Sequence, residues 1–166
     1  MRGLHVLALI VVCSCTGAHD VSTKGRDLRS HPGVRLIEDY VSGDIAGRRL
    51  HHDLWFANAV IWEDEPAYDQ YSAVRDVALT PISADSSTAR VQVQYDVLGT
   101  ITSTASDSLV FEASHTAQVI VFTAVLTDNG WRIAAPQQAF RVRAETLLTE
   151  RRLLADSRTR LAALMR

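Results

Sequence analysis

Cysteine is scarce in this sequence of 166 residues, and its two cysteines, Cys13 and Cys15, both lie close to the N-terminus. A disulfide between them would stabilise a fold very little, because closing so short a loop removes little chain entropy. Removal of the N-terminal segment would leave one cysteine or none. The sequence therefore predicts a domain without a disulfide framework, a cysteine-ligated metal or thiol catalysis.

Long apolar runs are also absent from the N-terminal segment. Residues 4–12 (LHVLALIVV) form an apolar run of nine residues, whereas a transmembrane helix needs about 20. A short apolar run that follows one positive charge, Arg2, and precedes small residues is typical of an export signal.

The residues that follow the apolar run suggest how the signal ends. Val12 lies three places before Cys15 and Ser14 directly before it, which resembles a bacterial lipoprotein signal. That resemblance implies a signal peptide over 1–14, a lipid on Cys15 and a flexible polar tether over 15–30. We therefore expect an exported protein, lipid-anchored to a bacterial membrane and facing the periplasm or exterior. The alternative is ordinary cleavage after Ala18, which follows the small residues Thr16 and Gly17.

Excess positive charge is lacking too. The chain has 17 basic and 19 acidic residues, a formal net charge of −2. A nucleic-acid-binding surface is basic and clustered, so no nucleic-acid partner is expected.

Familiar catalytic and cofactor motifs are missing. The chain has no G-x-S-x-G, no P-loop and no G-x-G-x-x-G. The run His51-His52-Asp53 suggests a metal site, but successive residues of a helix point about 100° apart, and ligands converge at i, i+3 or i+4. We therefore predict no metal and no cofactor.

The periodicity of apolar residues divides the chain into helices followed by strands. A helix should begin at Pro32, capped by Ser30 or His31, and continue as one bent or two short helices to about residue 56. Strands are predicted over 58–64, 74–83, 89–98, 109–111, 116–127 and 131–135, with a tight turn at Asn129-Gly130. The predicted fold is α+β: over 31–140, N-terminal helices pack on a curved antiparallel sheet, and a C-terminal amphipathic helix follows.

Two segments carry a resemblance to a known family. Residues 43–62 (GDIAGRRLHHDLWFANAVIW) and 127–133 (TDNGWRI) resemble the helix-to-strand passage and the last hairpin of the nuclear transport factor 2-like superfamily. The resemblance implies a cone, in which a bent sheet surrounds helices and leaves a pocket at the wide end. Members include cyclases and isomerases as well as binding domains, so the fold does not decide the activity. Five aromatic residues would pack together inside such a cone and could line its pocket: Tyr40, Trp55, Trp62, Tyr95 and Trp131.

Asp64 and His115 are the candidates for a catalytic base. Asp64 follows Trp62 at the end of a predicted strand, and His115 precedes the most apolar strand. Enzymes of the superfamily often place an Asp/His pair in the cone, but the corresponding segment here, 65–73 (EPAYDQYSA), contains no histidine. We therefore expect a non-catalytic, membrane-tethered domain that binds a partner protein or a small apolar ligand. The alternative is a cyclase- or isomerase-type enzyme that uses Asp64 or His115.

The last segment, 141–166, is basic and amphipathic. Leu147, Leu154 and Leu161 recur every seven residues, which predicts one apolar stripe on a helix of about six turns. The segment carries seven arginines against three acidic residues. Because an isolated helix is marginal in water, the stripe should dock onto its own domain, onto a second copy in a homodimer, or onto another protein.

Overall fold

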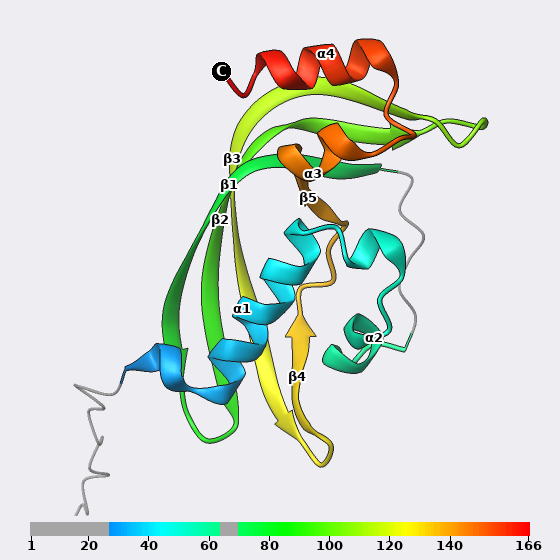
Figure 1. The fold of residues 1–166 in the computed structure, drawn as a ribbon. Helices are drawn as coiled ribbons and strands as arrows, with labels where there is room; N and C mark the ends of the chain where they lie inside the picture. Colours follow the sequence, from blue (N-terminus) through cyan, green and yellow to red (C-terminus); the bar gives the residue numbers. More distant parts are fainter. Residues whose placement is uncertain (1–26, 64–69) are drawn as a thin grey trace, which may run out of the picture.

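A computed structural model describes residues 27–63 and 70–166 of the chain (Figure 1). The predicted signal peptide, Cys15, most of the tether and Asp64 lie outside these residues. The elements follow the order η1 (Leu28–Ser30), α1 (Pro32–Ile45), η2 (Arg49–His51), α2 (Trp55–Ala59), β1 (Gln70–Ala84), β2 (Thr88–Ser103), β3 (Leu109–Thr127), β4 (Gly130–Ala135), β5 (Arg141–Arg143), α3 (Ala144–Thr149) and α4 (Ala155–Ala163).

Helix α1 starts where the sequence predicts. The His31 side chain caps the helix by accepting a hydrogen bond from the backbone N–H of Gly33 at 3.2 Å, and Pro32 occupies the first turn. Gly33 is required by packing, because a Cβ atom there would lie 2.6 Å from the ring of Trp131. The first turn of α1 is therefore held directly against β4.

The strands form one five-stranded sheet in the order β4-β3-β2-β1-β5. Strands β1 to β4 run antiparallel to their neighbours along the chain, whereas β5 pairs with β1 in parallel. The long strands curve strongly, so that the sheet forms a half-barrel around α1 (Figure 1). The α+β architecture, with N-terminal helices on a curved sheet and a helical C-terminus, is confirmed; the parallel strand makes the sheet mixed.

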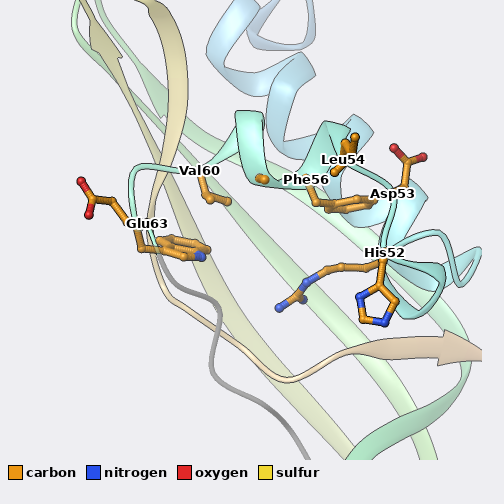
Figure 2. Close-up of a pocket in the computed structure, with 9 residues that line it drawn as sticks. His52, Asp53, Leu54, Phe56, Val60 and Glu63 are labelled. Atoms are coloured by element: carbon orange, nitrogen blue, oxygen red, sulfur yellow. The ribbon is translucent and has the colours of Figure 1, made fainter.

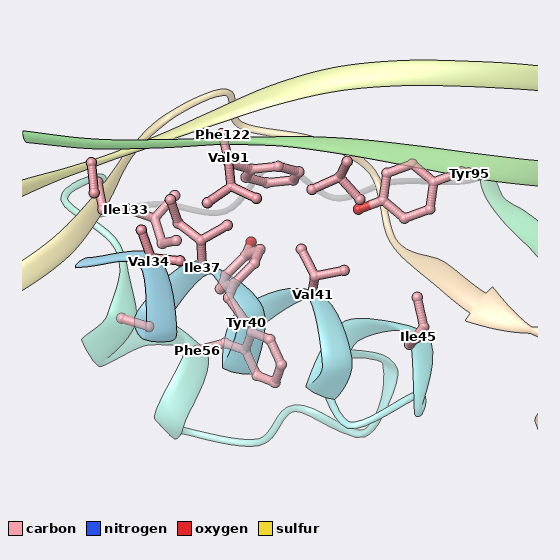
Figure 3. Packing of buried hydrophobic residues seen from close by; sticks show 14 of the residues in the cluster. Val34, Ile37, Tyr40, Val41, Ile45, Phe56, Val91, Tyr95, Phe122 and Ile133 are labelled. Atoms are coloured by element: carbon pink, nitrogen blue, oxygen red, sulfur yellow. The ribbon is translucent and has the colours of Figure 1, made fainter. Parts of the chain in front are cut away.

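The main core lies between α1 and the concave face of the sheet. Helix α1 turns one apolar stripe towards the strands, and Figure 3 shows this stripe facing Val91, Tyr95 and Phe122. The stripe consists of Val34, Ile37, Tyr40, Val41 and Ile45. Its spacing is that of one helix face, as the sequence predicts.

The predicted strand over 58–64 is not observed in its described part. Residues 55–59 form α2 instead, and Val60 contributes only an isolated bridge to Ile133. The physical reason is the spacing of Phe56 and Ala59. These residues are three positions apart, and a helix buries both in the main core, where the Phe56 ring lies 5.2 Å from that of Tyr40.

The prediction that one continuous helix spans 141–166 is also wrong. The segment forms β5, α3 and α4, and a turn followed by an isolated bridge at Leu153 separates the two helices. There the backbone N–H of Leu109 donates to the carbonyl of Arg152 at 2.8 Å, and the backbone N–H of Leu154 donates to the carbonyl of Leu109 at 3.1 Å. The break lets this segment pair with the end of β3. Leu147 and Leu161 bury their side chains in a second core of the same domain, whereas Leu154, the third residue of the predicted stripe, is 45% exposed.

Candidate functional site

A cavity of about 200 Å³ opens beside α2, between the end of the helical region and the loop that follows (Figure 2). One side is apolar and is formed by Leu54, Phe56, Ala57, Val60 and Trp62. The polar lining consists of Arg49, His52, Asp53 and Glu63. In Figure 2 the carboxylate of Glu63 points away from the other labelled side chains, so the cavity combines an apolar wall with few polar groups.

The loop before α2 fixes one rim of this cavity. His52 adopts a left-handed backbone conformation (φ 57°, ψ 39°), which is uncommon for a residue other than glycine. Asp53 accepts hydrogen bonds from the backbone N–H of Trp55 at 3.0 Å and from Nε of Arg48 at 2.8 Å. These two donors lower the pKa of Asp53 below its ordinary value. The carboxylate therefore stays ionised, and its two hydrogen bonds hold the loop.

Three charged side chains are buried behind the cavity: Asp44, Arg49 and Arg141 are 4%, 2% and 5% exposed. Asp44 lies in the last turn of α1. Its Oδ1 lies 3.5 Å from Nη1 of Arg49, and its Oδ2 accepts a hydrogen bond from the backbone N–H of Arg141 at 3.2 Å. Nη2 of Arg49 donates to the carbonyl of Gln138 at 2.6 Å. We call these three residues the buried charge cluster. It ties the end of α1 to the connection between β4 and β5.

The guanidinium of Arg141 donates hydrogen bonds to uncharged groups. It donates to the carbonyl of Ala139 at 3.1 Å and to the side-chain carbonyls of Gln118 and Gln138, both at 3.2 Å. It also lies over the ring of Tyr95, 4.7 Å from the centroid. Burial lowers the pKa of Arg141 and raises the pKa of Tyr95, because the charged form of each is penalised away from water.

The buried charge cluster carries two guanidinium groups and one carboxylate. Burying charged groups is costly unless they are paired and hydrogen-bonded. Arg49 belongs to both the buried charge cluster and the cavity lining, so it connects the two.

The sequence does not predict that these residues form a cluster, because charged side chains are rarely buried. One signal was available: Asp44 and Arg49 lie five positions apart within the predicted helical region. That spacing alone does not indicate burial.

The five aromatic residues proposed for a pocket occupy different places. Trp62 lines the cavity. Tyr40 and Tyr95 are buried in the main core, and the ring of Tyr40 lies 6.5 Å from that of Trp55. Trp55 borders a shallow depression on another side of the α1 end, with Asp39 and Arg48. Trp131 lies at the N-terminal end of α1, where its ring contacts His31 edge-on at 5.0 Å.

His115 lies on β3 with its side chain 60% exposed. Its Nε2 is 2.6 Å from Oδ1 of Asp96, whose other oxygen lies 3.2 Å from Nε of Arg75. None of these three residues lines the cavity beside α2 or the depression at Trp55. Asp64, the other candidate base, lies outside the described residues.

His51 and His52 are both exposed. Within residues 27–63 and 70–166, no group of three or more His, Cys, Asp or Glu side chains is placed to hold a metal ion.

Comparison with protein-family models, with curated proteins and with solved structures finds no significant match. Among the described residues, no helix combines the length and hydropathy needed to cross a membrane.

Proposed function

We propose that this chain is a non-catalytic binding domain of the bacterial cell envelope, held at a membrane through Cys15. We further propose that the cavity beside α2 binds a small ligand. The observation that carries the proposal is the position of Arg49, which lines the cavity beside five apolar residues and belongs to the buried charge cluster.

The size of the cavity limits the ligand. An apolar cavity of about 150 Å³ accommodates benzene, so a cavity of about 200 Å³ suits a ligand not much larger than one ring with one substituent. Drug-sized ligands occupy about 300 to 1,000 Å³. A partner protein would have to insert a single side chain here.

The lining indicates the chemistry of the ligand. Phe56, Val60 and Trp62 would contact an apolar body, and Arg49 would interact with an acceptor such as a carboxylate. The proposed ligand is therefore a small apolar molecule with one anionic or carbonyl group.

The architecture is compatible with the cone of the nuclear transport factor 2-like superfamily, and we propose membership of that superfamily. The support is the curved half-barrel around α1, together with the two sequence segments that resemble the family.

Binding can be tested with three probes of similar size: indole, benzoate and benzylamine. The full chain should bind benzoate more tightly than the neutral and cationic probes, as measured by ligand-detected NMR. Ala57→Phe places a ring in the cavity and should weaken benzoate binding at least about tenfold, equivalent to about 1.4 kcal/mol.

Asn58→Phe provides the control, because Asn58 is the next residue of α2, is exposed and does not line the cavity. This variant should bind the probes as the original chain does. Failure of all three probes to bind, or equal binding by the Ala57→Phe variant, would show that the cavity is not a ligand site.

A further inference from the structure

Within the part of the chain that the structure describes, strand β3 has a long unpaired edge. It pairs with β2 from Leu109 to Val125, but β4 covers its other side only from Thr123 to Thr127. At the opposite end, the segment between α3 and α4 bonds to Leu109. Among residues 27–63 and 70–166, no strand pairs with β3 over 112–122 on the side away from β2.

The side chains next to this edge are also exposed over part of its length. All six residues over 112–117 are exposed, although successive side chains of a strand point to opposite faces. Both faces of β3 are therefore uncovered there. Val119, two residues further along, is 58% exposed and is one of the most exposed large apolar side chains of the described chain.

The ladder with β2 determines which backbone groups point outwards. The N–H of Leu126 donates to the carbonyl of Ser87, on the β2 side. Because the direction alternates along a strand, Ala117, Val119 and Val121 direct their N–H and C=O groups to the open edge. Their side chains lie on the outer face, where Val119 is opposite Gln94 and Val121 opposite Gln92.

We propose that this edge pairs with the same edge of a second copy of the chain. The two β3 strands would run antiparallel about a two-fold axis at Val119. Ala117 of each copy would then pair with Val121 of the other, and the two sheets would become one ten-stranded sheet.

The limits of the open edge favour a second copy over a longer peptide strand. On one side, Thr123 already pairs with Ala135. On the other side, a bulge interrupts the ladder between Thr116 and Ala113, and bulges bend a strand out of register. The regular open stretch is therefore 117–121, which is symmetric about Val119.

Charge also favours self-pairing. Residues 116–127 (TAQVIVFTAVLT) contain no charged side chain, so no like charges oppose each other across the axis. Proteins commonly protect free edges with Lys or Pro, and this stretch has neither. A two-fold pair closes on itself and uses both open edges at once.

Sedimentation equilibrium of the full chain tests the proposal, in a Cys13→Ser, Cys15→Ser background that prevents cysteine cross-links. The background chain should sediment as a dimer at micromolar concentrations. Val119→Lys brings two ammonium groups together at the axis and should raise the dimer dissociation constant at least about tenfold. Ala78→Lys is the matched control, since Ala78 is exposed on the same outer face, opposite Gln94, but lies on β1.

Ala117→Pro gives an independent test through the backbone. Proline removes the outward N–H of Ala117 and leaves the β2–β3 ladder intact, because that N–H does not face β2. This variant should also be monomeric, with an unchanged circular dichroism spectrum. A monomeric background chain would overturn the proposal and would leave the edge to a different partner. Dimers that survive both Val119→Lys and Ala117→Pro would also overturn it.

Discussion

Two guanidinium groups and one carboxylate lie in the interior of a small domain, and their arrangement determines how the helices meet the sheet. Asp44 is the only acidic member of the buried charge cluster, and it contacts both Arg49 and the backbone of Arg141. Burial of charge is costly unless it is paired. Asp44 should therefore matter far more for stability than any carboxylate on the surface.

Asp44→Asn tests this at the scale of the residue. The substitution keeps the shape and the acceptor oxygen but removes the negative charge that lies beside Arg49 and Arg141. We expect the free energy of unfolding to fall by about 3 kcal/mol, as when one partner of a buried pair is removed. Urea denaturation followed by circular dichroism measures the change.

Glu38→Gln is the matched control for that experiment. Glu38 pairs with Arg29 at 3.2 Å, but the arginine side chain is 61% exposed. An exposed pair contributes about 0.2–1 kcal/mol at most. Equal losses in the two variants would show that the buried charge cluster does not stabilise the fold.

Among the elements, those with a regular apolar period could be predicted from the sequence. Helix α1 follows its apolar stripe, and β2 follows the alternation over 89–98. The turn at Asn129-Gly130 forms the β3–β4 hairpin, where Gly130 has a φ of 93°. These elements depend on local spacing and turn chemistry.

The elements that were mispredicted depend on contacts between distant parts of the chain. Residues around Leu153 are extended because they pair with the end of β3 at Leu109, and no pattern within 141–166 reveals that partner. The cavity could not be predicted for the same reason, because its lining residue Arg49 is positioned by a hydrogen bond to the carbonyl of Gln138. Tertiary contacts of this kind override helical periodicity.

Helix α4 should depend on one buried hydroxyl for its docking. Ser157 is 1% exposed, and its Oγ accepts the backbone N–H of Phe111 at 2.9 Å. Ser157→Ala would leave that N–H unsatisfied, at a cost of about 1–3 kcal/mol. Thermal unfolding should show a clear drop in melting temperature.

Thr159→Ala is the control for α4. Thr159 is exposed, and its hydroxyl donates only within the helix, to the carbonyl of Ala155 at 3.0 Å. This variant should melt close to the original chain. A Ser157→Ala variant that melts as high as the control would mean that the bond to Phe111 contributes nothing to docking.

For the molecule as a whole, the two ends of the described chain lie far apart. Residue 27 enters beside α1 and the β1–β2 hairpin, where Arg29 donates to the carbonyl of Leu79, whereas α4 lies at the opposite end (Figure 1). The basic C-terminal segment is docked on its own sheet through Leu147, Leu153 and Leu161. An anchor at Cys15 would therefore attach the domain by the end away from α4.

The last prediction concerns the proposed anchor at Cys15. The nine-residue run 4–12, which is apolar except for His5, is too short to hold a chain in a bilayer, which needs about 20 apolar residues. Membrane attachment should therefore depend on the lipid at Cys15. Cys15→Ala should either release the protein from membranes or leave the signal uncleaved, whereas Cys13→Ala, two residues away, should change little. Metabolic labelling with a fatty acid, followed by membrane fractionation, measures both effects. An original chain that takes up no label would instead favour cleavage after Ala18 and a secreted domain.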